Sequence, residues 1–148
     1  MAGAELYYED VEFGDDIGPV ERVVTDDEVK EFLSVRQPHV GPSRFTDAEH
    51  ARSEGLPGAI VPGAFNMAIM SQLITDWSPS VTLRKLDVVF RQVVPHNKPL
   101  KIQGIVTDKN IIDGEAQLEC DVYMENEEGT RLLIGKATVV LPSRELLE

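Results

Sequence analysis

The sequence predicts an α+β fold in which one antiparallel β-sheet curls around a central helix. In residues 62–76, apolar and small side chains surround most of a helix instead of forming one stripe, which is typical of a helix enclosed by protein. After residue 77 the apolar period changes from 3.6 to 2, and four β-rich runs follow, separated by short turns. Short turns join antiparallel neighbours, so these runs predict a single sheet that packs on the central helix.

The elements before the central helix are set by capping and breaking residues. Residues 19–25 alternate like a short strand. Thr25 and Glu28 form a capping box for a helix that is expected to run through residue 36 and to be stopped by Pro38. Residues 37–45 contain two prolines and a glycine and therefore predict an irregular loop, a common place for site residues.

A second, shorter helix is expected before the central one. Thr46 and Glu49 repeat the capping box, and Gly55 is expected to end that helix. Pro62 suits the first position of the central helix, because the N–H that proline lacks would have no partner there. Gly63 leaves the neighbouring backbone N–H groups uncovered, so this helix end is a potential binder of an anion or a carbonyl group.

The four expected strands cover residues 81–94, 100–108, 115–125 and 131–141, with turns at residues 95–99, 113–114 and 126–129. Cys120 lies in an alternating run, which favours a half-buried structural thiol. The whole chain, residues 1–148, has a length that suits one domain with a single core.

Composition excludes several classes of function. The net charge of −12 repels phosphate backbones and anionic membranes, so nucleic acid and membrane are not expected partners. No apolar window approaches the roughly 18 to 20 residues needed to span a bilayer, and the first ten residues lack a signal-peptide pattern; a cytoplasmic protein is expected. No His, Cys, Asp or Glu set has metal-ligand spacing, so neither metal nor cofactor is expected.

Four segments together resemble the single-domain MaoC-like hotdog family, which includes (R)-specific enoyl-CoA hydratases and 3-hydroxyacyl thioester dehydratases. They are YYEDVEFGDDIG, TDDEVKEFLSV, TDAEHARSEGLPGAIVPGAFNMAIMSQL and VVFRQVVPHNKPL, in this order along nearly the whole chain. The resemblance implies a hotdog fold and an acyl thioester ligand, carried by coenzyme A or by an acyl carrier protein. It also implies a homo-oligomer, either a hotdog dimer or a larger assembly.

In active members of that family, an Asp and a His in the loop before the central helix share the general acid and base work. An ungapped alignment with the family pattern places Val40 at the Asp position and Phe45 at the His position. A shift of one residue places Arg44 at the His position and His39 at or beside the Asp position. No catalytic residue is therefore in register, and His39 is the one weak candidate. Pro62 also replaces a family His, as in noncatalytic halves of the family.

The substrate-binding residues implied by the resemblance are Gly63, Ala64, Phe65, Arg44 and His39. The Gly63 N–H would bond the thioester carbonyl, the acyl chain would run along the apolar flank near Phe65, and the two loop residues would be polar contacts. The alternative for Gly63 is close packing against the sheet. Of the other histidines, His50 is expected on a surface helix and His96 in a strand turn away from the site. Some basic strand residues could meet coenzyme A phosphates: Arg84, Lys85, Arg91, Lys98 and Lys101.

Three functions stay open. The leading one is an acyl-thioester binding protein related to hydratases and dehydratases, which are lyases, without the catalytic pair; whether it is an enzyme is open. The second is a noncatalytic substrate-binding subunit that works with a catalytic paralogue. The third is a hotdog thioesterase, for which the central helix offers only Asp76, at its far end.

Overall fold

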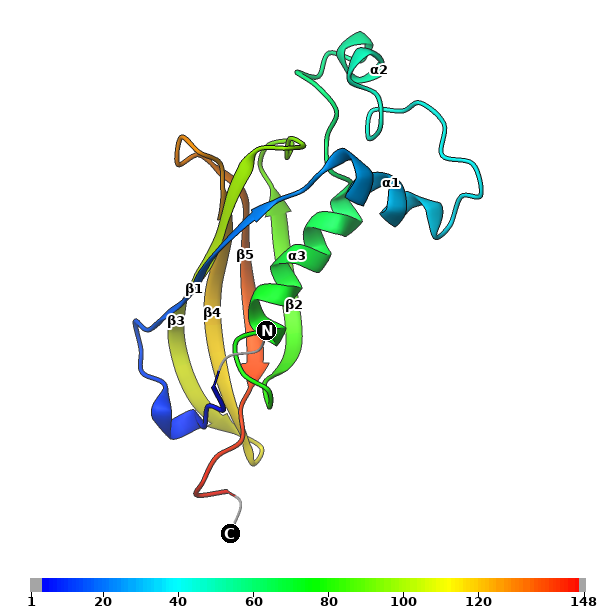
Figure 1. Ribbon diagram of the computed structural model, residues 1–148. Helices are drawn as coiled ribbons and strands as arrows, with labels where there is room; N and C mark the ends of the chain where they lie inside the picture. Colours follow the sequence, from blue (N-terminus) through cyan, green and yellow to red (C-terminus); the bar gives the residue numbers. More distant parts are fainter. Residues whose placement is uncertain (1–3, 147–148) are drawn as a thin grey trace.

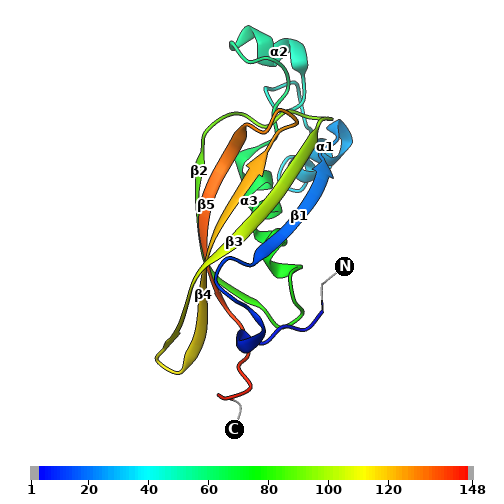
Figure 2. The ribbon, with the colours of Figure 1, turned by 90° about the vertical axis from the view of Figure 1, so that its left-hand side faces the viewer.

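The computed structural model describes residues 4–146 and confirms the α+β fold. Five antiparallel strands form one curved sheet in the order β1-β3-β4-β5-β2, and the central helix α3 lies across its concave face (Figure 1). Figure 2, turned by 90°, looks onto the outer face of the same sheet, with α3 behind it. The strands are β1 (Asp16–Val23), β2 (Thr82–Phe90), β3 (Pro99–Ile112), β4 (Glu115–Glu125) and β5 (Arg131–Val140); the helices are α1 (Asp26–Ser34), α2 (Ala48–Ser53) and α3 (Gly63–Thr75), after a short 3-10 turn at Tyr8–Asp10.

The turn between β3 and β4 shows why the sequence located the hairpin but not the full strand. Asp113 and Gly114 have φ angles of 52° and 79°, the left-handed pair that a two-residue hairpin turn requires. β3 continues to Ile112, beyond the expected end at residue 108. An irregularity between Val106 and Asp108 breaks the pairing register and with it the period-2 pattern, so the rest of the strand was missed.

Helix α3 is covered by the sheet along one side. Its buried residues recur at helical spacing: Phe65, Asn66, Ile69, Met70, Leu73 and Ile74. Each large apolar side chain among them contributes roughly 1.5–3 kcal/mol by leaving water. Ala64, Ala68 and Gln72, on the opposite side, are exposed. The predicted enclosure is therefore found on the sheet side only, because one sheet cannot reach around the helix.

The beginning of α3 differs from the expectation by one residue. Pro62 is not the first helical residue; it precedes the helix as its N-cap, with extended backbone (φ −60°, ψ 147°). Gly63 is the first helical residue, and the helix ends at Thr75, one residue before the expected end. A proline N-cap has no side-chain oxygen, so it leaves the first N–H groups of α3 uncapped.

Helix α1 keeps its predicted cap but ends early. The Thr25 hydroxyl accepts a hydrogen bond from the Glu28 N–H at 3.2 Å, and the Glu28 carboxylate accepts one from the Thr25 N–H at 3.1 Å. The helix ends at Ser34 instead of residue 36, and Val35, which follows it, is 84% exposed. None of the helices within residues 4–146 is long and apolar enough to cross a membrane.

The predicted capping box of α2 is wrong. Asp47 caps this helix, because its carboxylate accepts hydrogen bonds from the N–H groups of Glu49 (2.9 Å) and His50 (3.3 Å). The Thr46 hydroxyl instead donates to the Gly41 carbonyl at 2.9 Å and stabilises the preceding loop. Gly55 ends the helix as predicted, with φ +88°. Helix α2 and its flanking loops project beyond the end of the sheet (Figures 1 and 2).

Cys120 is fully buried within β4, whereas the sequence indicated half-burial. Burial, followed by the charges of Glu119 and Asp121, raises the pKa of its thiol to about 12. The thiolate is the reactive form of cysteine, so this residue is a packing residue without chemistry.

Candidate functional site at the N-terminus of α3

The first turn of α3 presents backbone donors without helical partners. The first bond inside the helix runs from the Asn66 N–H to the Pro62 carbonyl at 3.1 Å, and Pro62 provides no side-chain cap. The N–H groups of Gly63, Ala64 and Phe65 therefore point out of the helix end. They also form the positive end of the helix dipole, which favours an oxygen with partial negative charge.

Gly63 opens into a pocket of ≈ 300 Å³, here called the Gly63 pocket. The wall is mostly apolar, and it comes from the loops before and after α2, from α3 and from the end of β2 with the chain that follows it: Phe45, Ile60, Val61, Gly63, Asn66, Phe90, Arg91, Gln92, Val93 and Val94. A Cβ at Gly63 would meet only the Phe90 ring, at 3.6 Å, which is ordinary van der Waals distance. Close packing therefore does not require glycine at this position.

The polar groups of the Gly63 pocket are few. Arg91 is the one ionisable side chain in its wall, and the wall holds no carboxylate or imidazole. Asn66 is 2% exposed; its Nδ2 donates to the Val61 carbonyl at a long 3.4 Å, and its Oδ1 has no hydrogen-bond partner among residues 4–146. Helix N–H groups, an amide and a guanidinium can hold a carbonyl or an anion, but arginine is a poor base, so none of them suits proton abstraction.

Of the loop residues singled out by the sequence, only Phe45 lies at the Gly63 pocket. Arg44 is half-exposed and pairs with Glu54 at 3.0 Å, away from the pocket wall. His39 is exposed on the loop and is not among the lining residues. The structure thus places an aromatic side chain beside Gly63, and it does not bring Arg44 or His39 there.

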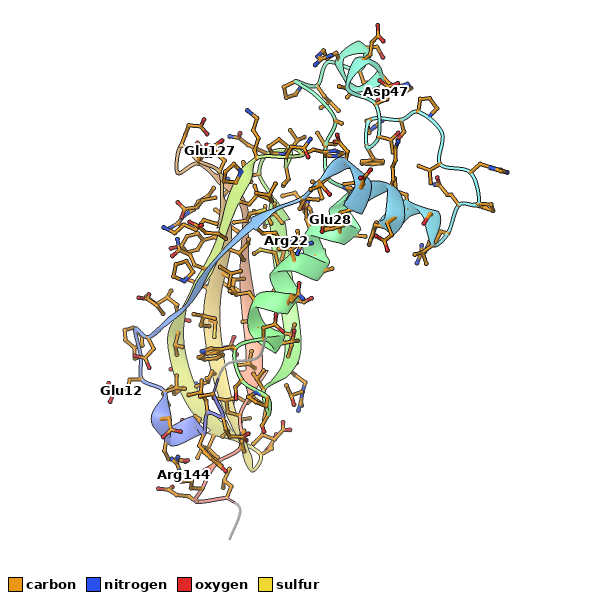
Figure 3. All side chains as sticks on the ribbon, in the orientation of Figure 1. Glu12, Arg22, Glu28, Asp47, Glu127 and Arg144 are labelled. Atoms are coloured by element: carbon orange, nitrogen blue, oxygen red, sulfur yellow. The ribbon has the colours of Figure 1, made fainter. Side chains whose placement is uncertain are left out.

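Ala64 and Phe65 face other surroundings. Ala64 and Pro62 line a second pocket of ≈ 400 Å³, whose remaining wall is the end of α1 and the chain after it. The Phe65 ring is 9% exposed and packs on the Phe32 ring, with 5.0 Å between centroids. The Arg22 guanidinium lies 5.7 Å from the Phe65 ring centre and pairs with Glu28 at 2.8 Å. Figure 3 labels Arg22 and Glu28 close to α3. Phe65 is therefore a core residue that supports the helix end.

The basic residues expected to meet phosphates do not form one cluster. Arg84 makes two hydrogen bonds to Glu115, at 3.0 and 2.7 Å. This pairing raises the pKa of Arg84 and lowers that of Glu115. Lys85 lies 3.4 Å from Asp87. Both pairs are on the sheet surface, whereas Arg91 lines the Gly63 pocket.

His96 lies in the connection between β2 and β3, as expected, and it does not line the Gly63 pocket, but its ring reaches the backbone ahead of α3. Its ring is buried: Nδ1 lies 2.7 Å from Asp26 Oδ1, and Nε2 lies 2.9 Å from the carbonyl oxygen of Ile60, two residues before Pro62. The hydrogen bond from His96, and then that from Asn97, lowers the pKa of Asp26. No local pattern joins positions 26 and 96, so this pair could not be predicted from neighbouring residues. Within residues 4–146, no group of three or more His, Cys, Asp or Glu side chains is placed to hold a metal ion.

Known structures share this fold. A MaoC-like dehydratase from Rhodospirillum rubrum superposes with a TM-score of 0.77 at 22% identity, over 94% of this chain and 98% of that one. The (R)-hydratase PhaJ1 from Pseudomonas aeruginosa gives a TM-score of 0.80 at 18% identity, over 95% and 88%. A chain of the ChsH1–ChsH2 complex from Mycobacterium tuberculosis gives 0.74 at 16%, over 88% and 98%.

No protein-family model matches the sequence, and no curated protein matches it. The similarity is therefore one of structure, and it covers most or nearly all of the length of each of these three neighbours. The chain has the hotdog fold that MaoC-like dehydratases and (R)-hydratases share.

Proposed function

We propose that this chain is a MaoC-like protein that binds an acyl thioester, with the thioester carbonyl accepting a hydrogen bond from the Gly63 N–H. The observation that carries the proposal is the open first turn of α3 at the wall of the Gly63 pocket. A carbonyl oxygen can accept hydrogen bonds from the backbone N–H groups at that helix end and is attracted by the positive end of the helix dipole. The apolar wall suits an acyl chain. The carrier is coenzyme A or an acyl carrier protein, and no separate cofactor is needed.

We further propose that the chain by itself does not hydrate or dehydrate the bound acyl group. Addition of water to an enoyl thioester needs a general base for the water and an acid for the carbon. The wall of the Gly63 pocket offers Phe45 where the family resemblance places a histidine, and Arg91 stays protonated at any relevant pH. The pocket can therefore polarise a thioester, but it lacks a group to move the proton.

A second chain would complete this site. β2 is an edge strand of the sheet, and its last residues Val89 and Phe90 are 58% and 48% exposed. Phe90 also lines the Gly63 pocket, so a chain that covered this edge would bury its apolar residues and reach the pocket. We infer a dimer through this edge, with a second copy or with a catalytic paralogue that supplies an acid and a base. The ChsH1–ChsH2 neighbour is a complex of two different chains.

The thioesterase alternative has less support. Asp76 is the C-cap of α3 and lines a separate pocket of ≈ 190 Å³. At 1.5 Å per helical residue it lies roughly 20 Å along the axis from Gly63. A carboxylate at that distance cannot activate water for attack on a carbonyl at Gly63.

Calorimetric titration with butyryl-CoA tests the proposed carbonyl site. Gly63→Val places a branched side chain over the N–H, and we expect roughly 10- to 100-fold weaker binding from the lost hydrogen bond. Gly63→Ala is the matched control, because its Cβ has room and the N–H remains open, so its loss should be clearly smaller. Equal affinity of wild type and a folded Gly63→Val would mean that this helix end only packs.

A further inference from the structure

We propose that His96 is a positioning residue, a buried imidazolium cation that fixes the peptide ahead of α3 and so sets where the Gly63 N–H points. Its effect on ligand binding rests on the proposed function. Its charge state and its hold on the backbone do not, and both can be measured in the protein without ligand.

The charge state follows from the partners of the ring. The His96 side chain is 5% exposed, and each ring nitrogen lies within hydrogen-bond distance of an oxygen. The Ile60 carbonyl can only accept, so Nε2 carries a hydrogen. Asp26, whose pKa is lowered by the hydrogen bonds from His96 and then Asn97, is ionised at neutral pH and can also only accept. Both nitrogens therefore donate, and the ring carries a positive charge.

The surroundings of His96 supply one compensating charge. From α1 comes the Asp26 carboxylate, which also accepts from Asn97 Nδ2 at 3.1 Å. The neighbouring pocket of ≈ 350 Å³ adds one further cation, Lys98, and its wall from α2 and residues 57–60 is uncharged. Lys30 acts on Asp26 and helps to keep it ionised. A buried cation that is hydrogen-bonded to one carboxylate forms a strong, directional contact.

The backbone that His96 holds leads directly to the site. The Ile60 carbonyl and the Val61 N–H belong to one peptide group, and the Val61 N–H donates to the Val94 carbonyl at 2.8 Å. Residues 94–96 therefore hold this peptide at both of its polar ends, two residues before Gly63. If Nε2 lost its proton, its lone pair would face the Ile60 oxygen, and the contact would become repulsive. The peptide would then be released on one side.

Nuclear magnetic resonance of the unliganded protein tests this directly. The chain has three histidines, and His39 and His50 are exposed, so they serve as internal references. With ¹⁵N-labelled histidine, we expect His96 alone to show two slowly exchanging ring N–H groups at neutral pH. In His96→Asn, which loses the bond to the Ile60 carbonyl, the backbone amide signals of Val61 and Gly63 should shift, whereas His50→Asn should leave them in place. A His96 ring with one N–H at neutral pH, or Val61 and Gly63 amide signals that do not change in His96→Asn, would overturn the proposal.

Two matched variants separate positioning from general stability. In His96→Gln the terminal amide nitrogen can still reach the Ile60 carbonyl, whereas the shorter His96→Asn reaches only toward Asp26. We expect His96→Asn to bind butyryl-CoA roughly tenfold more weakly than wild type, the loss of about one hydrogen bond, and His96→Gln to recover most of that.

The outcomes distinguish the two proposals. Folded His96→Asn and His96→Gln that bind equally would show that His96 has no positioning role at the site. Failure of every variant and of wild type to bind butyryl-CoA would refute the proposed function, and the amide shifts of Val61 and Gly63 would then decide the role of His96 alone.

Discussion

The Gly63 pocket and the loop of residues 37–45 are neighbours with opposite chemistry. The loop carries two ionisable side chains: Arg44 pairs with Glu54, and His39 is exposed to solvent. The pocket carries almost no ionisable side chain, yet its helix N–H groups and the Asn66 Oδ1 have no partner within residues 4–146. The groups that can bind a ligand at the Gly63 pocket are therefore mainly backbone donors. The ionisable side chains of the loop are either paired or exposed to solvent.

We expect this difference between the loop and the Gly63 pocket to have its largest effect on turnover. Hydration of crotonyl-CoA by the purified chain should be slower than that of an enzyme with a base in place, by roughly 10²- to 10⁴-fold, because the pocket wall offers no base. A coupled absorbance assay measures it, with and without a catalytic paralogue. Turnover at ordinary enzyme rates would contradict this prediction and would indicate that His39 acts as the base. In that case His39→Ala should abolish activity, with His50→Ala as the control.

A smaller effect, on thermal stability, is expected when the Asn66 amide in the wall of the Gly63 pocket is replaced. Asn66 leaves its Oδ1 without a partner within the described chain, whereas leucine has the same branched shape, a larger volume and no polar group. Because an unsatisfied buried polar group costs about 1–3 kcal/mol, Asn66→Leu should raise Tm by roughly 2–4 °C or more. Thermal unfolding by circular dichroism measures this. Asn66→Ala is the control and should gain less, because it leaves a cavity. A lower Tm for Asn66→Leu would mean that the amide oxygen is bonded in the folded protein.

The contribution of Asp26, the carboxylate that bonds His96, to thermal stability should depend on pH. The pKa of Asp26 is lowered from 3.8 in the folded state, so its contribution is present above that value and is lost as pH falls through the folded pKa. Asp26→Asn should therefore lower Tm by a few degrees at neutral pH, and the difference from wild type should vanish in strong acid. Asp27→Asn, in the same turn, controls for the helix dipole. A difference that persists unchanged at low pH would rule out the carboxylate as its source.

The smallest effects are expected in the loop and α2. Arg44→Ala removes an exposed ion pair, which contributes at most about 1 kcal/mol, and it should change butyryl-CoA affinity by less than about twofold.

Asp47→Ala removes the cap of α2 at a cost of about 1 kcal/mol. Hydrogen exchange should then rise within Ala48–Ser53 while affinity stays unchanged, because α2 projects beyond the sheet (Figure 3). Strong loss of binding in either variant would show that this region, and not the helix end alone, forms the site.

The sequence by itself determined the features that depend on neighbouring residues. The Thr25 and Glu28 capping box, the Asp113-Gly114 turn and the change of apolar period each act within a few residues, so they predicted α1, the hairpin and the sheet around α3. The exposed, uncapped start of the central helix was also readable, because proline and glycine act on their own backbone.

Only the tertiary structure decided which groups meet at the site. Phe45, and not Arg44 or His39, reaches the Gly63 pocket, because side-chain direction in an irregular loop depends on distant packing. His96 and Asp26 are 70 residues apart in sequence and meet only when α1 docks against the chain between β2 and β3. Asp47 replaced Thr46 as a cap because the fold offered the threonine a different carbonyl. Local signals cannot choose among such partners, because the competing hydrogen bonds are nearly equal in energy and tertiary contacts select between them.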